Sequence, residues 1–406
     1  VLALTFGYTM IVAETALGRM TKKSPVGAYH SFGKSKWLSF GGWINAIIPV
    51  LIVPYYSVIG GWVITYLVEY IIGNGHTLAA DGYFSAFISN GVSTELCFIV
   101  FSLCTLLIIY AGVRNGIERV SKIMMPILVV LSVIIAIYSI TRPGALAGVK
   151  YFLIPNVKNF SWMTVVAAMG QMFYSLSIAM GILVTFGSYM KKDISIEDST
   201  RNVEIFDTAI AIMAGLMIIP AVFAFSGGNP DTLQAGPALM FITIPKVFDS
   251  MGMGTIVGIL FFVLVLFAAM TSSIALTESA VSTFEDELGW GRKKATVMIG
   301  IIMLALGTLS SLGYGPLAAV EIIGMQFLDF FDFLTNSVMM PIAAVATCLL
   351  ISRVIGVKGI EEEVLHGEQS FKRKKIFRVM IQYLGPVFAL IILISSVANA
   401  FGWISM

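Results

Sequence analysis

Charged residues are scarce in this sequence. Only 12% of its 406 residues are charged, whereas 58% are hydrophobic. A soluble domain has about 25% charged residues and about 45–50% apolar residues, so this chain has too little charge to cover a soluble surface of its size. The net charge of +2 gives no indication of nucleic-acid binding. The composition therefore excludes an ordinary soluble domain and favours a protein that lies in a lipid bilayer.

Residues that carry enzyme chemistry are also few. The three cysteines, Cys97, Cys104 and Cys348, lie inside apolar stretches, where thiols act as small core residues. The three histidines are far apart, so no Cys/His cluster has metal-ligand spacing. The sequence contains no metalloprotease, serine-hydrolase or P-loop motif. It also has no repeat typical of a channel filter, so neither an enzyme nor a channel is expected.

Long apolar runs are abundant instead. A membrane-spanning helix needs about 20 mainly apolar residues. Since no Pro- or Ser-rich linker divides the chain, we expect an all-α, polytopic membrane protein with a single transmembrane domain over residues 1–406. The ten apolar segments lie near residues 1–18, 43–72, 95–112, 124–141, 163–190, 205–226, 254–283, 295–312, 322–351 and 379–404.

Basic residues alternate between the loops that join these segments. Cytoplasmic loops carry an excess of Lys and Arg. The loops after the odd-numbered segments are basic, and the second loop, 73–94, has no Lys or Arg. The even-numbered loops are poorer in basic residues overall, although they contain Arg142, Lys150, Lys158 and Lys246. The alternation predicts a plasma (inner) membrane protein whose C-terminus lies outside. The most charged stretch, 353–378, is interpreted as a solvated cytoplasmic loop.

The fifth apolar segment has an unusual centre, which contains Gly170, Gln171, Ser175, Ser177 and Gly181. Irregular backbone inside a membrane is tolerated where it lines a cavity. One interpretation is an unwound stretch at 175–181 whose carbonyl groups coordinate a cation. A face of small residues that packs against a neighbouring helix explains the same pattern equally well.

The seventh segment contains a second polar run, Thr271, Ser272 and Ser273. Hard cations such as Na⁺ prefer oxygen ligands. Hydroxyl groups that bond back to their own helix are the alternative, and this run by itself slightly favours that alternative.

Acidic residues inside apolar segments are more informative, because burying charge in a bilayer is costly and usually serves a function. Such acids are Glu14, Asp207, Glu278, Asp329 and Asp332. An acid near the end of a segment can also simply reach water, so this alternative stays open for each of them.

Seven short sequences occur in order along the chain: Glu14-Thr-Ala-Leu-Gly-Arg19, Pro54-Tyr-Tyr56 with Trp62, Gly170-Gln-Met-Phe-Tyr-Ser-Leu-Ser177, Gly187-Ser-Tyr189, Ala268-Ala-Met-Thr-Ser-Ser273, Phe284-Glu-Asp-Glu-Leu288 and Asp329-Phe-Phe-Asp332. Together they resemble the neurotransmitter:sodium symporter family over essentially the whole chain, and most of all its bacterial amino-acid transporters with eleven helices. The resemblance implies an inverted-repeat transporter fold with discontinuous helices, an arrangement known for this transporter class.

The resemblance also implies that the ten segments are family helices two to eleven. We interpret the apolar start of the chain, which has no initiator Met, as a cut inside or just before a span. The family's first helix, which supplies parts of both sodium sites and of the substrate site, would then be absent. That helix also carries the arginine of the outer gate.

The same resemblance implies roles for individual residues. The substrate site would comprise Ile52, Tyr56, Tyr174, Ser175, Ser177, Met180, Ser272 and Leu276. The first sodium site would use Ser175 and Asp207, and the second would use the carbonyl of Ala268 with Thr271 and Ser272. The gates would be Asp332 outside and Tyr189 with Asp286 inside, while Glu14 and Gln171 would brace the broken helix.

Two positions depart from the family pattern. Asp207 lies where many relatives carry Asn, and Ala211 lies where others carry a chloride ligand or a carboxylate. A permanent carboxylate balances nearby cations, so chloride is not expected as a cofactor. Met180 lies at an often aromatic position, and its flexible thioether suggests a roomy pocket.

We therefore expect a symporter, not an enzyme, that uses Na⁺, in two sites, to import neutral hydrophobic or aromatic L-amino acids by alternating access. The alternatives are an amino-acid sensor on the same scaffold and a transporter of another family with this fold. The oligomeric state stays open.

Overall fold

The computed structural model describes residues 1–156, 158 and 160–404, and almost all regular structure within them is helical. The exception is an isolated antiparallel bridge between Ile322 and Met325. The α-helices are α1 Tyr8–Thr21, α2 Pro25–His30, α3 Lys36–Ile71, α4 Gly75–Leu78, α5 Tyr83–Ser89, α6 Gly91–Tyr110, α7 Arg119–Ile140, α8 Ala145–Leu153, α9 Trp162–Ser175, α10 Ile182–Tyr189, α11 Ile196–Ser226, α12 Gly236–Ala238, α13 Ile244–Asp249, α14 Gly254–Leu288, α15 Arg292–Leu312, α16 Phe327–Asp332, α17 Met340–Leu349, α18 Val357–Leu365, α19 Lys374–Val379 and α20 Gly385–Ala400.

Shorter helical segments of other types extend or connect these helices. A 3₁₀ turn lies at Pro230–Thr232. The π-helical segments are Ala3–Gly7, Val113–Glu118, Leu239–Thr243, Phe333–Met339, Leu350–Ile355 and Met380–Leu384.

Among the residues that the structure describes, eight helical runs are long and apolar enough to cross a membrane. The other two expected segments form shorter helical pieces. Segment 1–18 consists of a π-helical turn followed by α1, and segment 163–190 is divided into α9 and α10. The expectation of a polytopic all-α protein with a discontinuous helix is thus confirmed. For segment 163–190, the difference arises because hydropathy does not register a break in the backbone, whereas the helix of segment 1–18 continues from its π-helical turn into α1.

Several helices extend beyond their apolar segments. α3 begins at Lys36 rather than near 43, and α11 begins at Ile196 rather than near 205. Polar helix ends are invisible to a hydropathy pattern, although they continue the same backbone hydrogen bonds. The expected start of the ninth span, near 322, is wrong, because α16 begins at Phe327 after a turn region.

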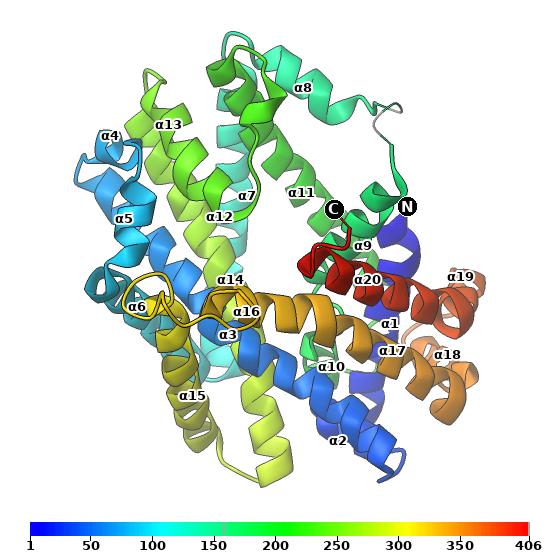
Figure 1. The fold of residues 1–406 in the computed structure, drawn as a ribbon. Coiled ribbons are helices and arrows are strands. Elements are labelled where there is room, and N and C mark those ends of the chain that lie inside the picture. Colours follow the sequence, from blue (N-terminus) through cyan, green and yellow to red (C-terminus); the bar gives the residue numbers. More distant parts are fainter. Residues whose placement is uncertain (157, 159, 405–406) are drawn as a thin grey trace.

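The site is positioned by two packed groups of helices. α3 packs against α14, α6 and α15, and α1 lies along α10 (Figure 1). The contact between α1 and α10 depends on glycine: a Cβ atom on Gly18 would lie 2.0 Å from the Val184 carbonyl oxygen, and one on Gly187 would lie 2.5 Å from that of Thr15. Small residues allow membrane helices to approach this closely.

The stretch 353–378 is not the solvated loop that its charge suggested. It contains α18, whose residues Val357, Ile360 and Val364 are buried at helical spacing. Glu361 is also buried and is paired with Lys374 (Nζ to Oε2, 2.9 Å) and Arg378. Burial by itself raises the pKa of Glu361, but the hydrogen bonds from Arg378 and Lys374 outweigh it, so the pKa lies below its usual value. Pairing between charges is what allows this charged stretch to pack.

Candidate functional site

The break between α9 and α10 lies at residues 176–181. Ser177, Ala179 and Gly181 all have positive φ angles, at 54°, 58° and 71°. A side chain on Gly181 would be strained, and its Cβ would also lie 2.7 Å from Pro25 and 2.8 Å from the Asn45 carbonyl oxygen. Glycine is therefore required here both by conformation and by packing. Of the two interpretations of this segment, the unwound stretch is the one that forms.

Glu14 supports the unwound backbone from α1. Its Oε1 accepts a hydrogen bond from the backbone N–H of Ala179 at 2.8 Å. The other oxygen, Oε2, is buried and has no hydrogen-bond partner among the described residues. Gln171, expected to act with Glu14, is exposed on α9 and does not bond to that carboxylate. Within the described residues, the bracing comes from Glu14.

Asp207 and Ser175 come together from different helices. The Ser175 hydroxyl, at the last residue of α9, donates to Oδ1 of Asp207 in α11 at 2.7 Å. Ser175 is exposed and Asp207 is partly buried. A carboxylate and a hydroxyl beside the end of a broken helix form a donor set suited to a hard cation.

The polar run of α14 leaves its helix intact. The Thr271 hydroxyl donates to the carbonyl oxygens of Phe267 and Ala268, both at 3.0 Å. The Ser273 hydroxyl faces the opposite way and is hydrogen-bonded to Thr105 of α6 at 3.1 Å. The Thr271 hydroxyl therefore bonds back to its own helix, and this bond holds it next to the Ala268 carbonyl oxygen.

Side chains of α3 and α14 meet next to this run. The side chains of Tyr56 and Ser272 lie close enough to interact. Ile52 lies one turn before Tyr56, and Leu276 one turn after Ser272, and both are buried. From the broken helix, Met180 is buried, whereas Tyr174 and Ser177 are partly exposed.

The outer acid, Asp332, has partners that the sequence did not indicate. Its Oδ1 accepts hydrogen bonds from the Tyr55 hydroxyl at 3.2 Å and from Nδ2 of Asn336 at 2.5 Å. Asp332 and Asp329 line a cavity of about 330 Å³. Asn336 lies one helical turn after Asp332, and that spacing was the only available signal.

The two expected inner-gate residues do not bond to each other. The Tyr189 hydroxyl donates to Oε1 of Glu278 at 2.7 Å. The carboxylate of Glu278 also accepts hydrogen bonds from both terminal nitrogens of Arg292. Asp286 instead accepts from the backbone N–H of Ser24 at 2.5 Å, at the start of α2. The sequence indicates Glu278 as a membrane acid but does not indicate its pairing with Arg292.

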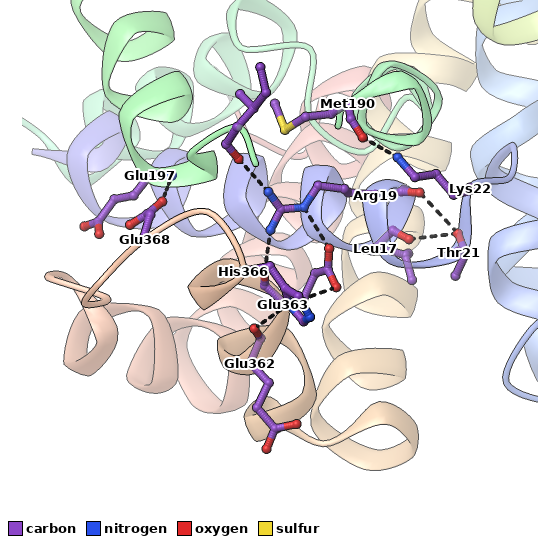
Figure 2. Close-up of polar contacts among 12 residues, drawn as sticks. Leu17, Arg19, Thr21, Lys22, Met190, Glu197, Glu362, Glu363, His366 and Glu368 are labelled. Atoms are coloured by element: carbon purple, nitrogen blue, oxygen red, sulfur yellow. Dashed lines mark hydrogen bonds and ion pairs between the residues drawn. The ribbon is translucent and has the colours of Figure 1, made fainter. Parts of the chain in front are cut away.

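A second buried ion pair, also missed from the sequence, fastens the end of α1 (Figure 2). Arg19 is fully buried, and its Nε donates to Oε1 of Glu363 in α18 at 2.7 Å. Its Nη1 donates to the Ile194 carbonyl oxygen at 2.6 Å, and Lys22 reaches the carbonyl of Met190. α1, α18 and the segment between α10 and α11 are therefore held together by one guanidinium.

A sequence model of the sodium:neurotransmitter symporter family matches residues 85–402. The chain belongs to this family. It is 34% identical over 373 residues to YhdH, an uncharacterized sodium-dependent transporter of Bacillus subtilis, covering 91% of this chain and 82% of the relative. An uncharacterized sodium-dependent transporter of Haemophilus influenzae is 29% identical over 413 residues, covering 98% of this chain and 88% of the relative.

The fold matches a solved structure of a family transporter. The crystal structure of MhsT in complex with L-phenylalanine superposes with a TM-score of 0.85 at 34% sequence identity, covering 97% of this chain and 89% of that one. The expected family, fold and transporter class are thus confirmed, and an enzyme is not supported. The chain is a multi-pass membrane protein of a sodium-dependent symporter family that moves a small molecule.

Proposed function

We propose that this symporter imports neutral hydrophobic or aromatic L-amino acids, driven by two Na⁺ ions, through a single membrane domain that alternates between outward and inward access. The observation that carries the proposal is the bond between Ser175 and Asp207 at the end of α9. A carboxylate held against a broken helix combines the two kinds of ligand, side-chain and backbone oxygen, that a dehydrated Na⁺ needs.

The first ion would bind Ser175 and Asp207 together with carbonyl oxygens of the break. Because the same segment carries Tyr174 and Ser177, ion and substrate would share one stretch of backbone. Each ligand then favours the binding of the other, which is the thermodynamic condition for coupled transport. The membrane potential adds about 2.3 kcal/mol per net charge per 100 mV.

The second ion would bind the Ala268 carbonyl, Thr271 and Ser272 on α14. The proximity of the Ser272 and Tyr56 side chains supports this assignment, because Tyr56 is the residue that would hold the substrate carboxylate. Ser272 would thus serve both ligands.

The substrate side chain would lie against Ile52, Met180 and Leu276, all of them buried and apolar. A flexible Met beside aliphatic walls suits apolar side chains of different shapes. The similarity to MhsT, solved with L-phenylalanine, supports an amino acid of this class.

Chloride would have no role in this transporter. Asp207 provides a permanent negative charge next to the first ion, so no additional anion is required for balance. Replacing external chloride with gluconate should leave uptake unchanged. A loss of uptake in gluconate would disprove this part of the proposal.

The gates would lie at opposite ends of the site. Asp332 would close the outer end, whereas Asp286 and Tyr189, through its bond to Glu278, would close the inner end. The distribution of basic loops supports a protein of the plasma (inner) membrane with its C-terminus outside.

The test is uptake of labelled phenylalanine and leucine by the purified protein in liposomes, with an inward Na⁺ gradient compared with K⁺. We expect accumulation only with Na⁺, and its loss in Asp207→Ala. Asp193→Ala, which removes an exposed carboxylate between α10 and α11, is the matched control and should transport normally.

Binding without accumulation would replace the transporter with an amino-acid sensor. Accumulation that is independent of Na⁺ would contradict the coupling ion, and competition by polar but not apolar amino acids would contradict the substrate class.

A further inference from the structure

A largely apolar groove lies on the surface between the first turns of α3 and the end of α17, hereafter the α3/α17 groove. Its volume is about 430 Å³, within the range of about 300–1,000 Å³ for sites that bind small molecules. Trp37 and Phe40 line it from α3, and Ala346 and Leu349 line it from α17. None of these residues belongs to the ion or substrate sites described above.

The lining of this groove includes one positively charged side chain, Arg353. Arg353, in the segment that continues α17, lines the groove and is exposed. It forms no hydrogen bond or ion pair with any described residue, unlike Arg19 and Arg292, which are each paired with a glutamate. Two further exposed cations, Lys34 and Lys36, precede Trp37 in the chain and are not paired with any residue of the described part of the chain. The groove thus presents unneutralised positive charge beside an apolar surface.

The residues of the groove are typical of a membrane interface. Trp37 is 84% exposed, and Trp is enriched where a bilayer meets water. Arg extends its apolar stem along hydrocarbon while its charged end reaches the headgroups. In the orientation proposed above, Arg353 lies on the cytoplasmic side, where the leaflet is rich in anionic lipid.

We propose that the α3/α17 groove binds an anionic glycerophospholipid of the cytoplasmic leaflet. One acyl chain lies along Phe40, Ala346 and Leu349, and the phosphate pairs with Arg353. The apolar walls alone would accept any lipid, so the unpaired arginine is what selects the anionic headgroup. The inference goes beyond the proposed transport activity and uses only its membrane orientation.

The test is lipid binding by the purified protein in detergent micelles. Dioleoyl-phosphatidylglycerol and dioleoyl-phosphatidylcholine are titrated in parallel, and retained lipid is counted by native mass spectrometry while the unfolding temperature is recorded. We expect phosphatidylglycerol to be retained in preference and to raise the unfolding temperature. Arg353→Gln should bind it about fivefold more weakly, the factor expected for one cation near an anionic surface.

Control variants separate the charge from the apolar walls. Lys192→Gln removes an exposed cation outside the groove and should bind like the wild type, and Arg353→Lys should retain the preference. Ala346→Phe fills the groove and should reduce lipid retention.

Three results would overturn the proposal. These are equal retention of the two lipids by the wild-type protein, unchanged binding by Arg353→Gln, and equal stabilisation by glycerol 3-phosphate, which lacks acyl chains. The wild-type comparison of the two lipids decides the question even if a variant does not fold. Because no uptake is measured, this test and the transport test can fail independently.

Discussion

Two membrane helices of this protein carry polar residues at their centres, but only one of them is broken. α14 is continuous from Gly254 to Leu288, although it contains three consecutive hydroxyl residues. The chain between α9 and α10 leaves the helix for six residues, three of them at positive φ. Hydroxyl content therefore does not decide whether a membrane helix unwinds.

The difference lies in what satisfies the backbone. In α14, the Thr271 hydroxyl returns to carbonyl oxygens of its own helix and leaves the helix intact. At the break, Gly181 allows the left-handed conformation, and Glu14 of a neighbouring helix accepts the N–H of Ala179. A break within a membrane needs an outside partner of this kind, because the bilayer supplies none.

Asp207→Ala should have the largest effect on transport. It removes the carboxylate that meets the broken helix at Ser175, whereas α14 has no acid in its polar run. Hydrogen bonds to charged groups contribute about 1.5–3 kcal/mol, so Na⁺-driven uptake should fall by a factor of about 10 to 150. Initial uptake rates at fixed substrate measure this, and a rate equal to that of Asp193→Ala would contradict it.

Gly181→Ala should have the largest effect on stability. The new Cβ would clash with Pro25 and the Asn45 carbonyl, and the alanine would be held at positive φ. Backbone strain alone costs about 1–3 kcal/mol, and the clashes add to it, so the free energy of unfolding should fall by more than that strain. Gly170→Ala is the matched control within α9, because its Cβ would contact nothing within 4 Å. That control should be neutral or gain about 0.5–1 kcal/mol. Unfolding temperatures in detergent compare the two, and equal losses would refute the requirement for glycine at the break.

Glu14→Ala should have the next largest effect, because it leaves the Ala179 N–H without its hydrogen-bond acceptor. An unsatisfied buried N–H costs about 1–3 kcal/mol, so both the unfolding temperature and substrate affinity should fall. Glu14→Gln keeps an acceptor oxygen and should retain most of both. If the Gln and Ala variants behave alike, the hydrogen bond is not what supports the break.

Thr271→Val should have the smallest effect on the fold. The hydroxyl bonds only to its own helix, so its loss should change stability by less than about 1 kcal/mol. The half-saturating Na⁺ concentration should nevertheless rise several-fold if Thr271 binds the second ion. An unchanged Na⁺ dependence, measured by uptake at graded Na⁺, would remove Thr271 from that site.

Much of this organisation could be predicted from local patterns. The positions of the apolar segments could be predicted, and so could the unusual composition near residues 175–181, because hydropathy and helix-weakening residues act over a few turns. The pattern did not decide between an unwound stretch and a face of small residues. The packing of α18 was not, since its charges suggested solvent. The structure instead pairs Glu363 with Arg19, which is 344 residues away. No local pattern reports a pair at that separation.

The sequence by itself determined that the chain is a helical membrane protein, where its helix is weak, and which family motifs it carries. Only the tertiary structure decided which acid braces the break, with Glu14 bonded and Gln171 exposed, and which partners Asp332, Tyr189 and Asp286 take. The physical reason is how far apart in the sequence the interacting residues lie. Hydrophobicity and backbone conformation are properties of neighbouring residues, whereas a buried polar group is satisfied by whichever distant element packing brings within hydrogen-bond distance.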